Sequence, residues 1–245
     1  MDSRAPVETV DTLATPHVEP PLVVYCTLSA KEALKELVPA FERDQGRRLE
    51  VTYAGGSVLA KRLTSGSAGD LFIGPEEFTH ELVSKGLLRA EQQQALALSS
   101  TALAISAQVA APETRTADQV KQLLLQAKSF CYSPGASGIY FAGLLERMGI
   151  GAAIASKTVR PGVGELVGSV VARGDAELGV QQISELLPVT GIHMLPLPSE
   201  LRQNIRYVAS LFTGARQPEA AIAFVDYLRS ANAGQIWRNK GLEPL

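Results

Sequence analysis

Residues 22–46 read LVVYCTLSAKEALKELVPAFERDQG, which contains a strand, a short turn and a helix in that order. The run Leu22–Cys26 is continuously apolar, and this predicts a strand buried on both faces of a sheet. Apolar side chains then recur at helical spacing from Ala33 to Phe41, and Gly46 supplies a typical helix stop. The segment therefore predicts the first unit of an α/β fold.

The same order repeats on both sides of the middle of the chain. LEVTY, SVLAKRLTSG, GDLFIG and EEFTHELVSKGLL follow the first unit, and KSFCYS begins a second series after residue 100. Alternation of this kind predicts parallel strands joined by right-handed crossovers in an open α/β sheet. A length of 245 residues favours two lobes.

Composition excludes several classes of partner. The net charge is −2, from 23 basic and 25 acidic residues, so no nucleic-acid partner is expected. Hydrophobic residues make up 46% of the chain, which supports a sizeable core. No apolar run approaches the ~18 residues typical of a membrane span.

The first twenty residues, MDSRAPVETVDTLATPHVEP, lack an apolar core behind a basic start. They do not match a secretory signal, and residues 1–20 are predicted to be a disordered tail. The chain is then expected to be cytoplasmic if complete, or to be given without its export signal.

Residues that often carry chemistry are few. Cys26 and Cys131 both follow apolar runs and are predicted to be buried free thiols, with a disulfide as the alternative. His17, His80 and His193 have no metal-ligand spacing to one another. No catalytic motif is present, so we expect no metal, no cofactor and no enzyme activity.

Four predicted strand–helix junctions contain short runs of small residues: TLS at 27–29, GGS at 55–57, SPGAS at 133–137 and PGVG at 161–164. Ligands of open α/β lobes bind at the carboxyl ends of strands, where helix N-termini offer free amides and partial positive charge. The alternative is that each serine only caps its own helix. Four such junctions together favour an anion site, with Arg160 and Lys61 as possible sources of charge.

Several of these stretches resemble the molybdate-binding proteins of ABC importers. They are residues 22–46, TYAGGSVLAKRLTSGSAGDLFIGP, SPGASGIYFAGLLERMG and VVARGDAELGV, and the likeness extends over residues 22–241. The resemblance implies an α/β, two-lobed type II periplasmic-binding-protein fold. Each lobe would be an open, mainly parallel sheet flanked by helices, and two crossover strands would join residues 21–100 plus 205–245 (lobe I) to residues 101–204 (lobe II).

The resemblance also implies a set of ligand-binding residues. Ser29 matches the family's first ligand serine, and the GGS turn matches its second site. The predicted set is Ser29, Gly56, Ser57, Ser137, Gly138, Val163, Gly164, Gln181 and Gln182. Glycines at 55 and 56 stand where the family has hydroxyls, and Gln182 stands where it has a tyrosine.

These departures favour an organic carboxylate or another oxyanion over molybdate. We therefore predict a monomeric solute-binding protein that captures a small anion in an interlobe cleft and delivers it to an ABC permease. The resemblance implies a periplasmic location. The alternatives are a cytoplasmic ligand sensor on the same fold and an isomerase or lyase on this scaffold.

Overall fold

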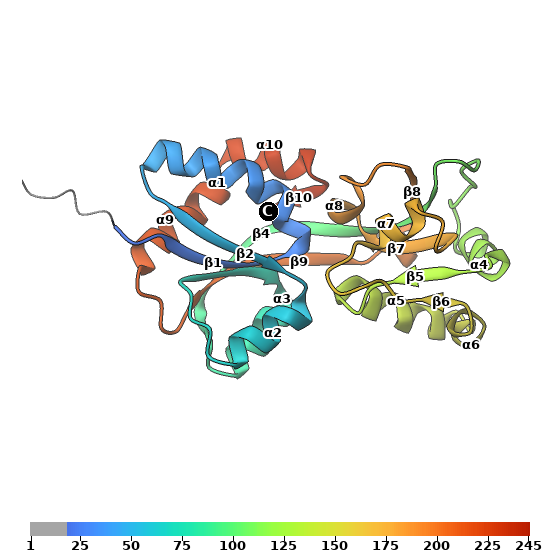
Figure 1. The fold of residues 1–245 in the computed structure, drawn as a ribbon, viewed down its shortest axis with the longest axis horizontal. Coiled ribbons are helices and arrows are strands. Elements are labelled where there is room, and N and C mark those ends of the chain that lie inside the picture. The colour runs from blue at the N-terminus through green and yellow to red at the C-terminus, as the bar shows by residue number, and fades with distance from the viewer. Residues whose placement is uncertain (1–18) are drawn as a thin grey trace, which may run out of the picture.

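The computed structural model describes residues 19–245, and it consists of two α/β lobes lying side by side (Figure 1). The first lobe contains three parallel strands in the order β2-β1-β3. Their bounds are Leu22–Thr27 (β1), Leu49–Ala54 (β2) and Leu71–Pro75 (β3). Around this sheet lie η1 (Leu28–Ala30), α1 (Lys31–Gln45), α2 (Gly56–Thr64), α3 (Glu76–Ser84), α9 (Pro218–Leu228) and α10 (Ala231–Asn239).

The second lobe is built on β7 (Leu178–Gln182), β5 (Phe130–Tyr132) and β6 (Thr158–Val159), which are parallel to one another. The antiparallel strand β8 (Ile192–Pro196) completes its sheet. The remaining elements are α4 (Ala117–Gln126), α5 (Ala136–Arg147), α6 (Gly151–Ala155), α7 (Val167–Ala172), α8 (Ile183–Leu186) and η2 (Ser199–Leu201).

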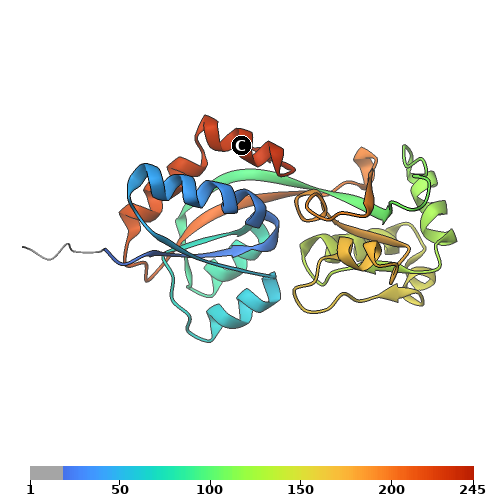
Figure 2. The same cartoon turned by 45° about the horizontal axis from the view of Figure 1, so that its top comes forward.

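Two antiparallel strands join the lobes, β4 (Leu88–Ser106) and β9 (Asn204–Phe212). β4 pairs with β9 as far as Ser100, and from Thr101 onward it pairs with β7. In Figure 2 both strands run between the lobes. The last strand, β10 (Leu242–Pro244), pairs with β4 and places the C-terminus against this connection.

Each lobe has its own aromatic core. In the first lobe Phe41 packs edge-on against Phe224 with a centroid distance of 4.9 Å. Trp237 is fully buried in the same core, and its Nε1–H donates to the Leu228 carbonyl at 2.9 Å. In the second lobe Phe130 stacks on Phe141 at 5.4 Å. The buried residues of the two lobes therefore form separate core clusters.

The structure confirms the predicted α/β, two-lobed fold with two crossover strands. Thr116 caps α4 in a full capping box. β4 is one strand of 19 residues that continues past residue 100. The lobe boundaries at 100/101 and 204/205 stay a prediction. The predicted tail, residues 1–20, lies outside the described residues except for Glu19 and Pro20.

None of the helices in the described part of the chain is long and apolar enough to cross a membrane.

Both cysteines are buried and free, which confirms that prediction. Burial raises the pKa of Cys26 well above its usual range and that of Cys131 to about 11. We predict that Ellman's reagent detects no rapidly reacting thiol in the native protein and two after denaturation without reductant. Two fast thiols in the native state, or none after denaturation, would contradict this arrangement.

Candidate functional site

A cleft of about 950 Å³ lies between the lobes, at the carboxyl ends of strands β1, β2, β5 and β7. All four small-residue junctions predicted from the sequence reach it. This volume is at the upper end of the ~300–1,000 Å³ typical of small-molecule sites. The cleft is therefore the candidate ligand site, and it has room for more than a bare oxyanion.

The structure brings together eight of the nine predicted site residues. Those that line the cleft are Ser29, Gly56, Ser57, Ser137, Val163, Gly164, Gln181 and Gln182. Gly138 is not among the lining residues. A Cβ atom on it would lie 1.8 Å from the Ser133 backbone oxygen, so this glycine allows α5 to pack against the turn before it. Ligand contact by the set remains a prediction.

Two helix starts point into the cleft without side-chain caps. The N-cap of α2 is Gly55 and that of α5 is Gly135. Ser57 and Ser137 lie inside the first turn of these helices, so the interpretation that they are caps is wrong. The first-turn amides at both helix starts have no side-chain partner and are available to an anion.

The two glycines of the GGS turn leave space rather than permitting an unusual backbone. Gly55 has φ −63°, which any residue adopts, and an added Cβ would meet nothing within 4 Å. An added Cβ on Gly56 would make ordinary contact with Phe78 at 3.8 Å. The missing side chains therefore widen the cleft at this point.

The charges around the cleft are mainly negative. Its lining includes five carboxylates, Glu76, Glu77, Glu81, Glu165 and Glu185, and among the described residues one cation, Arg206. Arg206 Nε lies 3.9 Å from a Glu76 carboxylate oxygen, so its charge is shared.

The two cations suggested by the sequence are elsewhere. Lys61 does not line the cleft, and Arg160 stacks over the Tyr132 ring at 4.3 Å, also outside the lining. An anion in this cleft would therefore be held by amides and hydroxyls more than by cationic side chains.

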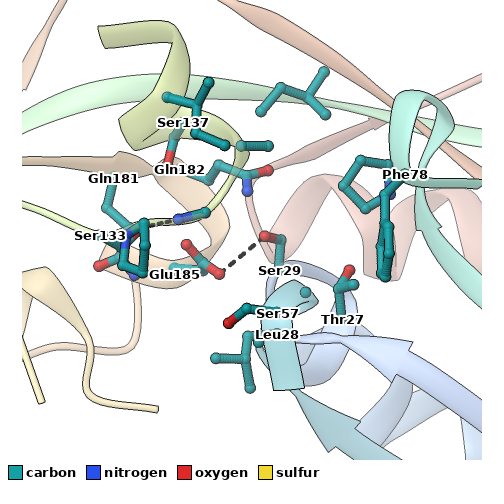
Figure 3. Close-up of a pocket in the computed structure, with 18 of the residues that line it drawn as sticks. Thr27, Leu28, Ser29, Ser57, Phe78, Ser133, Ser137, Gln181, Gln182 and Glu185 are labelled. Carbon is teal, nitrogen blue, oxygen red and sulfur yellow. Dashed lines mark hydrogen bonds between the residues drawn. The ribbon is translucent and has the colours of Figure 1, made fainter. Parts of the chain in front are cut away.

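One hydrogen bond joins the two lobes across the floor of the cleft. Ser29 Oγ, on η1, donates to Glu185 Oε1, on α8, at 3.0 Å (Figure 3). Ser29 is buried, and Glu185 is partly exposed toward the cleft. Removal from bulk water raises the pKa of Glu185 to about 7, although interactions with Ser29 and Gln181 counteract this. Near neutral pH this carboxyl is able both to accept and to donate a proton.

Three buried side-chain oxygens of the cleft lining have no hydrogen-bond partner among the described residues. They are Thr27 Oγ1, Gln182 Oε1 and Gln203 Oε1, all belonging to residues that line the cleft. Figure 3 shows Gln182 directed toward Ser29. An unpaired buried polar atom costs ~1–3 kcal/mol, so a ligand or water that pairs with these groups is favoured.

Sequence reasoning missed Glu185 and Tyr207. Glu185 lies in the first turn after β7, in the QQISEL run that supplied the two glutamines. An acidic residue in a helix that directly follows a strand is a pattern from which Glu185 could have been predicted. Tyr207 comes from β9, almost fully buried, and burial raises its pKa above the usual range, so its hydroxyl stays neutral. Only the tertiary fold brings it to the cleft.

No group of three or more His, Cys, Asp or Glu side chains within residues 19–245 is placed to hold a metal ion.

The chain is similar in sequence to known proteins over nearly its whole length. The profile of the "Bacterial extracellular solute-binding protein" family matches residues 22–243. The chain belongs to this family. An aconitate isomerase from Pseudomonas sp. is 32% identical over 219 residues, covering 86% of this chain and 83% of that protein.

Two molybdate-binding relatives support the fold and the binding-protein type. The molybdate-binding protein ModA of Escherichia coli K12 is 22% identical over 226 residues, covering 90% of this chain and 88% of that protein. The structure of the Azotobacter vinelandii periplasmic molybdate-binding protein superimposes with a TM-score of 0.72 at 16% identity, covering 90% of this chain and 98% of that one. By its family match this chain is a solute-binding protein, and its fold is that of the molybdate-binding proteins.

Glu185 predicts a pH dependence of stability. Its pKa is higher in the folded than in the unfolded chain, so the folded state binds the proton more tightly. The stability that protonation contributes is complete below the unfolded pKa, near pH 4.5, and is lost as the pH rises through about 7. Glu185→Gln, which stays neutral, is expected to raise Tm at pH 8 by about 3–6 °C, after allowance for partial exposure, and to change it little at pH 4.5.

The measurement is thermal unfolding of both proteins between pH 4.5 and 8. Glu77→Gln, on the exposed cleft rim, removes the same charge and serves as the control. Parallel wild-type and Glu185→Gln curves across the whole range would show that Glu185 is not desolvated in this way.

Proposed function

We propose that this protein captures a small organic di- or tricarboxylate in the interlobe cleft and delivers it to an ABC-type permease. The observation that carries the proposal is the pair of uncapped helix N-termini, on α2 and α5, that meet in a cleft with an otherwise acidic lining. Helix N-termini bind anions through backbone amides, without requiring a cationic side chain.

A carboxylate fits the cleft better than a compact oxyanion does. Its lining includes exposed apolar side chains, with Ile139 69% and Val163 94% exposed, and Phe78 on the opposite lobe. A carbon skeleton would bury these groups, whereas a tetrahedral oxyanion would not reach them. The glycines of the GGS turn remove hydroxyls that a compact oxyanion would need.

The relatives agree with an anionic ligand. One is named for molybdate and another for aconitate, and this chain is more similar to the latter, at 32% against 22% identity. We therefore place a carboxylate above molybdate as the ligand of this protein. Residues 21–100 with 205–245, and residues 101–204, would close over it as two lobes. A monomer acting in the periplasm, with no nucleic-acid partner, completes the proposal.

A second candidate function is isomerisation of an unsaturated carboxylate. The observation in its favour is Glu185, a carboxyl able to exchange protons within the cleft, together with the relative named aconitate isomerase. Binding comes first in both functions, because an isomerase needs the same carboxylate site.

Binding is tested by thermal shift with di- and tricarboxylates, molybdate, tungstate, sulfate and phosphate. A ligand at 100 times its Kd adds ~2.7 kcal/mol, which corresponds to a Tm rise of about 5–10 °C. Ser57→Asp is expected to abolish the shift, because it places a negative charge at the start of α2. Ser57 is exposed, so the fold should tolerate the change.

The matched control is Ser230→Asp, the same substitution at the N-cap of α10, which is not part of the cleft lining. It should leave the ligand-induced shift unchanged. Full affinity in Ser57→Asp would mean that the start of α2 does not hold the anion. The absence of a shift with every anion would overturn the proposed function.

Gly55→Ser tests why the cleft selects a carboxylate. Serine is a favoured N-cap, and its Cβ has open space here. We expect equal or higher Tm, tighter binding of molybdate and weaker binding of the carboxylate, measured by isothermal titration calorimetry. Unchanged relative affinities would show that the missing hydroxyl does not set selectivity.

A further inference from the structure

Among the described residues, three of the other four carboxylates of the cleft have a cationic partner, which Glu185 lacks. Glu165 accepts from Arg173 at 2.7 Å, and Glu81 pairs with Lys85 at 2.6 Å. Glu76 faces Arg206 at 3.9 Å. The pKa of Glu165 is lowered, first by the hydrogen bond from the Gly162 amide and then by Arg173.

The partners of Glu185 are neutral. Ser29 Oγ donates to its Oε1 at 3.0 Å, and Gln181 lies beside it, its own amide oxygen accepting from the Gly168 N–H at 3.4 Å. The titratable group that faces it is Tyr207 on β9, which stays neutral because burial raises its pKa. A carboxyl with neutral partners on η1, β7 and β9 loses and regains a proton without breaking an ion pair.

Its position is central to the cleft. Glu185 projects from α8 of one lobe toward Ser29 of the other, between Gln181 and Ser57 in the view of Figure 3. A ligand held by the amides of α2 and α5 would lie across this carboxyl. An acid–base group must reach the carbon that it deprotonates, and Glu185 belongs to the lining that such a ligand would contact.

We propose that Glu185 is the catalytic acid–base residue that moves a proton between two carbons of an unsaturated tricarboxylate bound in the cleft. The inference rests on the proposed carboxylate site and makes the second candidate function specific. It assigns the chemistry to one residue, and it requires no metal, redox partner or second substrate.

The step balances in atoms and electrons. The Glu185 carboxylate takes a proton from the methylene carbon next to the double bond, and the C–H electron pair spreads over the three-carbon allylic unit and its carboxylates. The protonated Glu185 then returns the proton to the other end of this unit, which becomes the new methylene carbon. The double bond has moved by one position, and Glu185 is again ionised.

The cleft also offers stabilisation for the intermediate anion. The added negative charge develops on carboxylate oxygens, which the first-turn amides of α2 and α5 are placed to receive. Preorganised donors of this kind are a large contribution to catalysis of carbanion formation. Exposed Ile139 and Val163 would exclude water when the lobes close.

The experiment is proton NMR in D₂O of cis-aconitate and, separately, trans-aconitate with the full chain. Wild type is expected to interconvert them and to introduce deuterium at the methylene carbon. Glu185→Gln should lower kcat/KM by about 10²–10⁴-fold. It should keep Kd for either isomer within a few-fold, measured by calorimetry, because the glutamine oxygen still accepts from Ser29.

Two controls make the role specific to this carboxyl. Glu50→Gln, at an exposed position of β2 outside the cleft lining, removes one negative charge and should leave kcat/KM unchanged. The wild-type kcat/KM should rise with pH through about 7, because the base must be ionised, and Glu185→Gln should show no such rise. Thermal unfolding of both variants verifies that they are folded.

The outcomes separate the two proposals. Binding without interconversion or deuterium uptake in wild type would overturn the role of Glu185 and leave the binding function intact. Activity retained in Glu185→Gln would also overturn it. The absence of binding to either isomer, with carboxylates failing in general, would overturn the proposed function and the inference together.

Discussion

The antiparallel pairing of β4 with β9 is the constraint on which the two lobes and the cleft depend. β4 exchanges its partner from β9 to β7 between Ser100 and Thr101, so the chain changes lobe within a single strand. Two adjacent strands then set how far apart the lobes lie, while each lobe keeps its own core. Small dihedral changes in this pair would alter the cleft width, as in the hinge closure of other two-lobed proteins.

The sequence was informative where local pattern and burial coincide. Buried strands such as Leu22–Thr27 are continuous apolar runs, and the helices that follow have one apolar face, so the α/β order could be predicted. Strand β4 could not be predicted in this way. Its first half, LRAEQQQ, is mostly polar and has irregular register, and it pairs with residues of β9 that lie more than a hundred positions away. Long-range pairing, not local propensity, makes that segment a strand.

The site residues also divide into those that the sequence could predict and those that it could not. Residues at strand ends, such as Ser29 and Gln182, could be placed near a ligand because carboxyl ends of parallel strands share one edge. Glu185 and Tyr207 could be assigned to the site only from the structure. Glu185 bonds to Ser29, 156 positions away, and Tyr207 lies on β9, a strand that runs between the lobes. The sequence also could not show that the cleft lining is acidic, because Glu76, Glu165 and Glu185 belong to three separate segments. An anion site with that lining must depend on backbone dipoles.

Trp237, the one tryptophan of the chain, has a consequence for spectroscopy. It is fully buried in the first lobe, hydrogen-bonded to Leu228, and not among the residues that line the cleft. Its emission therefore reports the packing of that lobe and stays nearly constant when the lobes close. Tyr140 and Tyr207 do line the cleft. Ligand titrations by fluorescence or near-ultraviolet circular dichroism should consequently follow the tyrosine bands, with the tryptophan signal as an internal reference for the folded state.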